Sequence, residues 1–210
     1  MPALTLANGQ RGLLAGKTGT GKTFGALFLL RHTQGPIVIL DSKIEPAFDT
    51  AFPPADITHQ DGLTGSYGPQ RIRIVRPAPH ELIKPAVLDA WLMQFDYPVT
   101  IFIDELYQIH SPGGRAGPGL VGLLTRGRSK GVNVLMATQR PRFISGFCLT
   151  EADKYYVYWL SKPADRKVLA EATVPEIMQQ PPPYHFWFYS QGSRAATLYT
   201  PVPAVLYREV

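Results

Sequence analysis

The stretch Gly16-Lys17-Thr18-Gly19-Thr20-Gly21-Lys22-Thr23 limits the possible folds of this chain more than any other part of its sequence. It matches the phosphate-binding pattern Gly-x-x-x-x-Gly-Lys-Thr at every fixed position. A short apolar run at residues 11–15 precedes it, and a longer apolar run at residues 24–30 follows it. These runs predict a strand and a helix, which is the context that makes the pattern a nucleotide site and not a chance match.

The chemistry of phosphate binding requires these residue types. Glycines allow positive φ and a close approach of the backbone to phosphate, and successive N–H groups at a helix N-terminus form an anion site. Lys22 can place a positive charge on the β- and γ-phosphates, and the Thr23 hydroxyl can ligate Mg²⁺. We therefore predict ATP and Mg²⁺ as ligands, with residues 16–23 on the nucleotide. A glycine-rich turn without a ligand is the alternative.

Length and composition set further bounds. The 210 residues suit one α/β domain, so we expect a single domain over residues 1–210. A net charge of +5 and a pI near 9.3 favour a polyanionic partner such as nucleic acid. The single cysteine, Cys148, fits a reducing compartment. The sequence shows neither a signal-peptide pattern nor an apolar run of the roughly 18 residues that span a bilayer, so we expect a soluble intracellular protein.

Strand and helix patterns alternate along the chain. This alternation predicts an α/β fold with a mostly parallel central sheet, helices on both faces and a C-terminal β-hairpin added at an edge. The hairpin is expected at residues 184–189 and 195–200. Residues 71–76 alternate arginine with apolar residues, which predicts an exposed edge strand protected by charge, with DNA contact as the alternative. The other predicted strands are 11–15, 37–40, 99–103, 132–137 and 155–160, and the predicted helices are 24–30, 45–52, 85–95, 120–130 and 163–172.

The strand at residues 99–103 ends in Asp104 and Glu105, which is the form of a Walker B strand. Asp104 would hold Mg²⁺ together with Thr23. Glu105 could polarise a water for attack on the γ-phosphate, which favours hydrolysis over phosphoryl transfer to a small acceptor. The alternative is a strand that ends in a helix N-cap, since acidic residues favour helix starts.

Polar residues also follow two other predicted strands. Gln139 comes shortly after the strand at 132–137 and would lie beside residues 16–23 if that strand neighbours the first one. There it could sense the γ-phosphate or position water, although a merely polar strand end is the alternative. Asp41-Ser42-Lys43 follows the strand at 37–40, at the edge where α/β proteins bind ligands. A turn with a helix cap accounts for these three residues equally well.

Residues 127–141, Gly-Arg-Ser-Lys-Gly-Val-Asn-Val-Leu-Met-Ala-Thr-Gln-Arg-Pro, resemble a segment of the FtsK–HerA group of ring ATPases. In that group a Gly-Arg pair precedes a strand that ends in Ala-Thr-Gln-Arg-Pro. Residues 39–43 and 153–169 also resemble parts of the group. The resemblance implies a P-loop NTPase of the RecA-like ASCE type. The small genome-packaging ATPases of membrane-containing double-stranded DNA viruses are bare motor domains of about this length, so they are the nearest match.

The resemblance implies a double-stranded DNA translocase for viral genome packaging, acting as a hexamer or similar ring with ATP at subunit boundaries. Arg128 matches the group's arginine before the sensor strand, so the resemblance implies that a neighbour supplies it to the γ-phosphate. Arg126 is the second candidate, and contact with solvent or DNA phosphate is the alternative for both. Viral capsid or membrane-vertex proteins are implied as partners. The host cytoplasm is the expected location, with association with the virion as a further expectation.

Two other functions stay open at the level of sequence. One is a P-loop ATPase for another cargo, such as virion assembly or export, and the other is a small-molecule kinase. For DNA contact we favour the loop at residues 111–119, in which Arg115 is the only charge, with a flexible connector as the alternative. Arg140, Arg142 and Lys130 are the next candidates. DNA-stimulated ATP hydrolysis would separate the packaging function from the other two.

Overall fold

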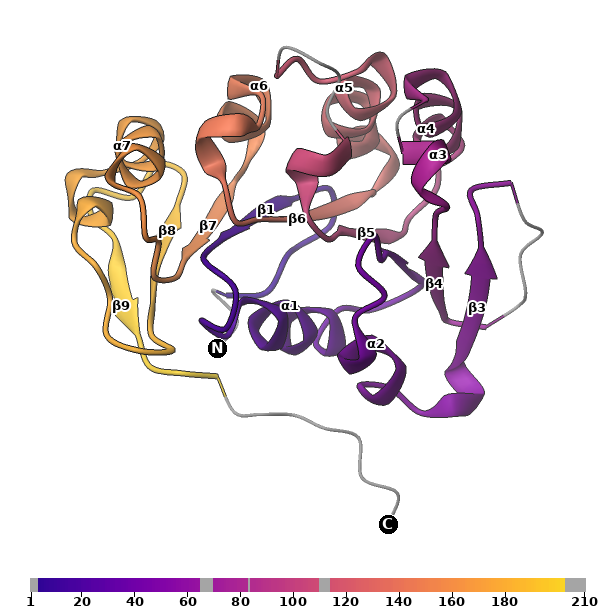
Figure 1. The fold of residues 1–210 in the computed structure, drawn as a ribbon, viewed down its shortest axis with the longest axis horizontal. Coiled ribbons are helices and arrows are strands. Elements are labelled where there is room, and N and C mark those ends of the chain that lie inside the picture. The colour runs from indigo at the N-terminus through magenta and orange to yellow at the C-terminus, as the bar shows by residue number, and fades with distance from the viewer. Residues whose placement is uncertain (1–3, 65–69, 83, 110–113, 203–210) are drawn as a thin grey trace.

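A nine-stranded sheet in the order β3-β4-β2-β5-β6-β1-β7-β8-β9 runs through the centre of the molecule (Figure 1). The computed structural model describes residues 4–64, 70–82, 84–109 and 114–202. The strands are β1 (Arg11–Ala15), β2 (Ile37–Leu40), β3 (Ile57–Asp61), β4 (Ile72–Arg76), β5 (Thr100–Ile103), β6 (Asn133–Thr138), β7 (Lys154–Val157), β8 (Phe186–Ser190) and β9 (Thr197–Tyr199). The α-helices are α1 (Lys22–Arg31), α2 (Pro46–Thr50), α3 (Pro79–Leu82), α4 (Pro85–Met93), α5 (Pro118–Thr125), α6 (Gly146–Glu151) and α7 (Pro163–Ala172). The short 3-10 helices are η1 (Pro54–Asp56), η2 (Leu106–Ile109), η3 (Arg126–Lys130), η4 (Pro141–Phe143) and η5 (Pro175–Met178).

The pairing of the strands confirms the predicted fold class. β1 pairs in parallel with β6 on one side and with β7 on the other, and β2 pairs in parallel with β4 and β5. β8 and β9 are antiparallel and form the predicted hairpin at one edge. The strands that precede the predicted site residues therefore all point the same way, and their carboxyl ends meet at one edge of the sheet.

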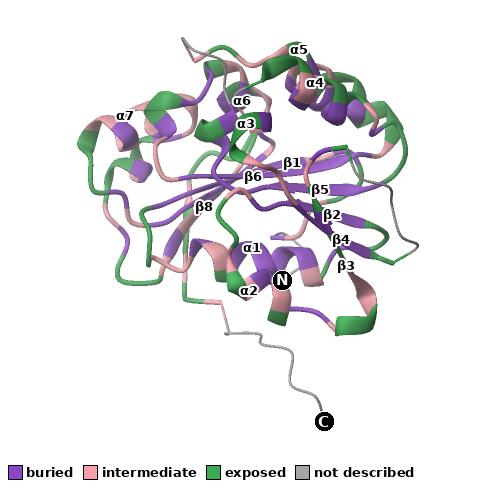
Figure 2. Ribbon diagram, turned by 45° about the vertical axis from the view of Figure 1, so that its right-hand side comes forward, coloured by how far each residue is buried: buried purple, intermediate pink, exposed green. Residues whose placement is uncertain are grey.

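Helices cover both faces of the sheet. α1 and α2 lie on one face, and α3 to α7 lie on the other (Figure 1). Alternate residues of β1 point to the two faces, so Leu13 belongs to the core under α4 to α7 while Leu14 belongs to the core over α1. The central strands are buried between these layers, whereas the edge strands β3 and β9 and the outer surfaces of the helices are largely exposed (Figure 2). No helix among the described residues has the length and apolar character of a membrane span.

The apolar face predicted for residues 85–95 is confirmed. Leu88, Trp91, Leu92 and Phe95 are all at least 96% buried. The helical spacing of the first three places them on the buried side of α4, and Phe95 lies just beyond its end at Met93. The predicted strands are all present, and the largest difference is at residues 155–160, where β7 ends at Val157. Beyond that point the regular pairing stops because β1 ends at Ala15. The Tyr158 N–H still donates to the Ala15 carbonyl at 2.8 Å.

The expectation of an exposed edge strand at residues 71–76 is wrong. β4 lies between β2 and β3, and Arg73 is 7% exposed with its guanidinium 5.5 Å from the centre of the Phe95 ring. The edge position is taken by β3, whose Ile57-Thr58-His59-Gln60-Asp61 sequence carries too few apolar residues to indicate a strand. The aliphatic part of an arginine side chain can pack on apolar surface. The alternation of arginine with apolar residues therefore did not indicate a solvent-exposed face of the strand.

The close contact between α4 and α5 depends on a glycine and gives a test of the fold. A Cβ atom at Gly119 would lie 2.5 Å from the Asp89 Cα atom and 2.6 Å from its carbonyl oxygen. Because both are backbone atoms, Gly119→Ala should force the helices apart and lower the free energy of unfolding by about 1–3 kcal/mol. Thermal unfolding should show a midpoint lowered by roughly 2–4 °C per kcal/mol for a chain of this size.

Gly122→Ala in the same helix is the matched control. Its Cβ would meet only the end of the flexible Arg126 side chain within 3 Å, and alanine favours a helix over glycine by up to about 1 kcal/mol. This variant should be as stable as the wild type or more so. Equal stability of the Gly119→Ala variant would contradict the close packing of α4 on α5.

Candidate active site

The loop between β1 and α1 has the backbone that the glycine-rich pattern predicts. Gly19 and Gly21 have φ of 79° and 95°, in the left-handed region that glycine adopts without strain. The loop is tied to both neighbouring strands, since the Gly16 N–H donates to the Thr138 carbonyl at 3.1 Å and the Lys17 N–H donates to the Trp159 carbonyl at 2.9 Å. The loop therefore has a fixed position at the carboxyl ends of β1, β6 and β7.

A cavity of about 510 Å³ opens beside this loop. The first turn of α1 and Gln139 contribute to its wall, together with Lys43 and Glu45 from the segment after β2 and Tyr184 from the segment before β8. Lys22 and Thr23 both line it. The predicted phosphate-binding residues thus surround one hollow, at the edge of the sheet where parallel α/β proteins bind ligands.

Glu105 is the centre of the polar contacts in this site. Its side chain is fully buried, and its Oε1 atom lies 3.5 Å from Lys22 Nζ and accepts a hydrogen bond from Gln139 Nε2 at 3.0 Å. Lys43 Nζ forms an ion pair with the same oxygen. The structure therefore brings together three residues that are far apart in the sequence and that were predicted as catalytic, namely Lys22, Glu105 and Gln139.

Two further details of this cluster bear on its chemistry. Gln139 Oε1 accepts a hydrogen bond from Thr18 Oγ1 at 2.7 Å, so the glutamine connects Glu105 to the glycine-rich loop. Glu105 Oε2 is buried without a hydrogen-bond partner among the described residues, and the residue has a φ of 54°. A buried carboxylate oxygen without a hydrogen bond costs free energy. A positive φ at a residue other than glycine strains the backbone, and both kinds of cost are typical of functional sites.

Asp104 lies beside Glu105 and is 4% exposed. Burial raises the pKa of its carboxyl group, and the nearby Lys43 and Lys22 ammonium groups oppose that rise. The Lys43 Nζ atom is 3.9 Å from Asp104 Oδ2. The two lysines therefore compensate two buried carboxylates, which would be costly in the core without opposite charge nearby.

The residues present fit a magnesium ion bound together with nucleotide. Mg²⁺ prefers oxygen ligands and is usually held by one or two carboxylates plus substrate phosphates. Asp104 and the Thr23 hydroxyl offer such oxygens, and the Oε2 atom of Glu105, the residue after Asp104, is a further buried acceptor without a partner among the described residues. The described residues contain no cluster of three or more His, Cys, Asp or Glu side chains that could hold a metal alone.

Lys43 and Tyr184 belong to the site, although the sequence assigned neither a role in it. Lys43 was one of three polar residues after a buried strand, and its position at the sheet edge was the available signal. Asp41 fixes that segment, since its carboxylate accepts hydrogen bonds from the Lys43 and Glu45 N–H groups and pairs with Arg76 Nε at 3.1 Å. Tyr184 follows three prolines, and no pattern linked it to the glycine-rich loop.

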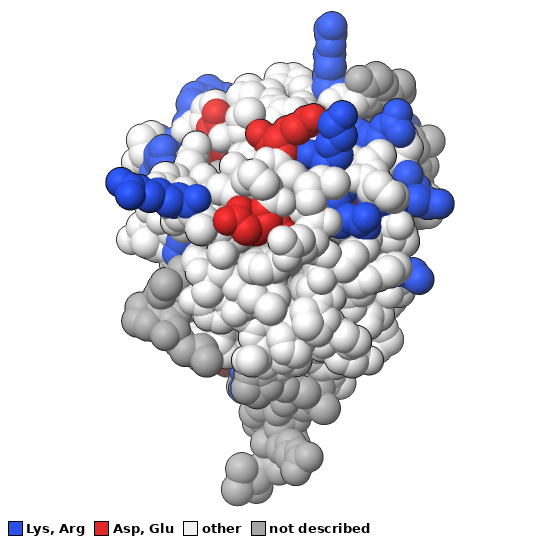
Figure 3. All heavy atoms as spheres, turned by 90° about the vertical axis from the view of Figure 1, so that its left-hand side faces the viewer, with Lys and Arg blue, Asp and Glu red and all other residues white. Residues whose placement is uncertain are grey.

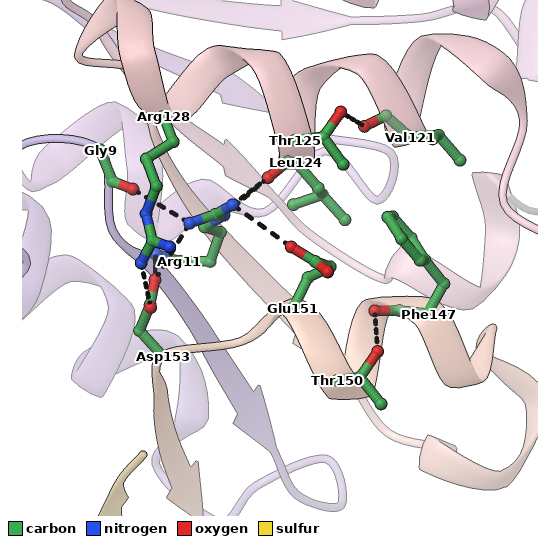
Figure 4. Close-up of polar contacts among 10 residues, drawn as sticks. All are labelled: Gly9, Arg11, Val121, Leu124, Thr125, Arg128, Phe147, Thr150, Glu151 and Asp153. Atoms are coloured by element: carbon green, nitrogen blue, oxygen red, sulfur yellow. Dashed lines mark hydrogen bonds and ion pairs between the residues drawn. The ribbon is translucent and has the colours of Figure 1, made fainter. Parts of the chain in front are cut away.

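Arg128 lies beside Arg11, at the start of β1 (Figure 4), whereas the glycine-rich loop follows the other end of that strand. Arg128 does not line the cavity. Its Nη2 atom is 2.6 Å from Asp153 Oδ1, and its side chain is 59% exposed. Asp153 also accepts a hydrogen bond at 2.8 Å from the N–H of Arg11, the first residue of β1. The structure therefore does not place Arg128 near the loop of its own chain.

Arg11 holds this end of the sheet together (Figure 4). Its side chain is 3% exposed and pairs with Glu151 at 3.3 Å and with Asp153 at 3.4 Å. Its Nε atom donates to the Leu124 carbonyl at 2.8 Å. The guanidinium thus joins β1 to α5, to α6 and to the start of β7.

The candidates for DNA contact are dispersed. Residues 111–113 of the predicted DNA-binding loop lie outside the described residues, and Arg115 is exposed. Arg142 and Lys130 are also exposed. The Arg140 guanidinium is less available to a DNA phosphate, because it pairs with the buried Asp165 at 3.3 Å and lies 4.5 Å from the centre of the Phe143 ring.

Comparison with known proteins confirms the predicted resemblance. No family model matches the chain. The DNA packaging ATPase P9 of Enterobacteria phage PRD1 is 28% identical over 218 residues, which cover 95% of this chain and 91% of that protein. The genome packaging NTPase B204 from Sulfolobus turreted icosahedral virus 2 has a similar structure. Its AMPPCP complex gives a TM-score of 0.72 at 16% identity over 92% of this chain and 98% of that one. Its AMP complex gives 0.71 at 16% identity over 93% and 99%.

Proposed function

We propose that this chain is an ATPase that drives double-stranded DNA into a viral capsid. The observation that carries the proposal is the contact of Lys22, Glu105 and Gln139 beside the glycine-rich loop. The similarity to a DNA packaging ATPase over nearly the whole of both chains supports the same function. The fold, shared with a genome packaging NTPase over at least 92% of this chain, is consistent with it.

The chain's own residues have distinct parts in the proposed hydrolysis. The N–H groups of residues 16–23 and the Lys22 ammonium bind the β- and γ-phosphates. Thr23 and Asp104 would hold Mg²⁺, which neutralises charge on the phosphate oxygens when it is bound. Glu105 accepts a proton from the attacking water, and Gln139 orients that water or senses the γ-phosphate. Lys43 balances the charge of the two buried carboxylates.

Glu105→Gln tests the role of the carboxylate. The change keeps the shape of the side chain and removes the base, so ATP binding should persist while turnover falls by about 10²–10⁴. Lys22→Ala should weaken binding as well, because it removes the charge that faces the phosphates. Equilibrium binding and a steady-state phosphate-release assay measure the two effects separately. Wild-type turnover by the Glu105→Gln variant would refute the assignment of Glu105 as the base.

We also propose that the protein works as a ring in which Arg128 of one subunit reaches the γ-phosphate bound to its neighbour. The position of Arg128 at the opposite end of β1 from the loop is consistent with this proposal, because a γ-phosphate that it contacts would have to be bound to another chain. Its exposed guanidinium would have to leave Asp153 to do so. Arg126, also exposed, is the second candidate.

A mixing experiment tests the shared site. Arg128→Ala should abolish turnover, since such an arginine contributes about 10³–10⁵ in rate, and should leave nucleotide affinity of the isolated subunit nearly intact. Mixing this variant with Glu105→Gln should restore part of the activity, because some interfaces then contain both intact residues. Stability is the control, because loss of an exposed ion pair costs less than about 1 kcal/mol. Normal assembly without recovery at any ratio would argue against a shared site.

The proposed DNA contact is the loop that ends at residue 119, with Arg115 as its charge. A packaging motor must grip phosphates without reading sequence. The face formed by α7 and the C-terminal hairpin is a poor candidate, because acidic side chains lie among its scattered lysines and arginines (Figure 3).

Capsid or membrane-vertex proteins are the proposed further partners, and the host cytoplasm and the virion are the proposed locations.

The function is tested by the ATPase rate and the oligomer mass, each with and without double-stranded DNA. We expect DNA to stimulate the rate, and Arg115→Ala to lower that stimulation while basal hydrolysis persists. In the Arg115→Ala variant, the slope of the logarithm of duplex affinity against the logarithm of salt concentration should fall in magnitude by about one for each subunit that contacts DNA. Hydrolysis without any DNA effect would favour another cargo, and phosphate transfer to a small acceptor would favour a kinase. An unchanged slope with unchanged stimulation in the variant would move the DNA contact to another surface.

A further inference from the structure

Tyr184 is an exposed aromatic residue at the rim of the cavity that holds the glycine-rich loop. Its side chain is 58% exposed, and it lines the cavity together with Lys22 and Thr23. Its Cδ1 atom lies 3.6 Å from the point where a Cβ on Gly21 would be. The ring therefore stands next to the N-terminus of α1, where the phosphates of a nucleotide bind in a loop of this kind.

The backbone around Tyr184 holds the ring in this position against its own preference. The residue has a φ of 62°, in the left-handed region that is unfavourable for a bulky side chain. Three prolines at residues 181–183 restrict the preceding chain. The turn that contains Tyr184 is closed by a hydrogen bond from the His185 N–H to the Pro182 carbonyl at 3.1 Å. A strained backbone that presents an apolar ring to solvent is a reason to look for a ligand.

A second exposed aromatic residue lines the same cavity. Phe24, in the first turn of α1, is 41% exposed. The wall also carries the charged Lys43, which contacts the buried carboxylates of Asp104 and Glu105. With the phosphates against the loop and the lysines, a nucleoside that occupies the rest of the cavity has the two exposed rings in its wall. Flat aromatic surfaces are the groups on which nucleobases stack.

We propose that Tyr184 stacks on the base of the bound nucleoside triphosphate and so sets the affinity of this site for nucleotides over bare polyphosphate. The inference rests on the ATPase function proposed above. A smaller hollow of about 360 Å³ lies on the other flank of Tyr184, next to Trp159. There the Lys17 ammonium lies 5.4 Å from the centre of the Trp159 ring, so a cation already covers that aromatic surface. Because stacking does not distinguish one base from another, ATP and GTP should bind this site with similar affinity.

Binding of AMPPCP, GMPPCP and inorganic triphosphate to Tyr184→Ala, each with Mg²⁺, tests the proposal by calorimetry. AMPPCP and GMPPCP should bind about tenfold more weakly than to the wild type, because the base loses its stacking partner. Affinity for inorganic triphosphate should stay within about twofold, since the loop and Lys22 are unchanged. Tyr184→Phe keeps the ring and should bind all three ligands as the wild type does.

Tyr97→Ala is the matched control, because Tyr97 is a similarly exposed tyrosine that packs near Phe95, away from the cavity. It should leave all three affinities unchanged. Unchanged affinity of Tyr184→Ala for AMPPCP would overturn the proposal, as would an equal loss for inorganic triphosphate, which would show a general effect on the loop. Neither outcome bears on the packaging function, which is tested separately by the effect of DNA on hydrolysis and by the absence of phosphate transfer to a small acceptor.

Discussion

Parallel pairing of β1 with both β6 and β7 is the constraint on which the site depends. This pairing places the carboxyl end of β1 between two strands, and the glycine-rich loop continues the hydrogen bonding through the Gly16 and Lys17 N–H groups. The same sheet brings β5 and β2 to the same edge. Residues that are separated by more than a hundred positions in sequence therefore lie within hydrogen-bonding distance, as Thr18 and Gln139 do.

Much of this arrangement could be predicted because it follows from local pattern and strand direction. The glycine-rich loop, the acidic pair after β5 and the glutamine after β6 each follow a buried strand. Parallel strands bring such residues to one edge, so Gln139 was expected beside the glycine-rich loop on the condition that the strand at residues 132–137 neighbours the first strand, as it does. The fold class followed from the same alternation of strands and helices.

The features that could not be predicted depend on contacts across long distances. The edge strand β3 is mostly polar, and it is a strand because β4 offers it hydrogen bonds, not because of its own residues. Arg73 is buried, and its guanidinium lies 5.5 Å from the centre of the ring of Phe95, which comes from another segment. Lys43 lies beside Glu105 only because Asp41 fixes the turn after β2. Tyr184 lies beside the glycine-rich loop because of the course of the chain between α7 and β8. That segment has no hydrophobic periodicity from which its position could be predicted.

The separation of the loop from Arg128 has a consequence for symmetry. The two lie at opposite ends of β1, whose five residues span about 17 Å at roughly 3.3 Å per residue. If Arg128 serves a neighbouring site, each subunit must use two different surfaces, one as donor and one as acceptor. Such a contact is heterologous, and it repeats around a ring or along an open filament. A two-fold dimer would need both surfaces to meet in one contact, which their separation along the strand opposes.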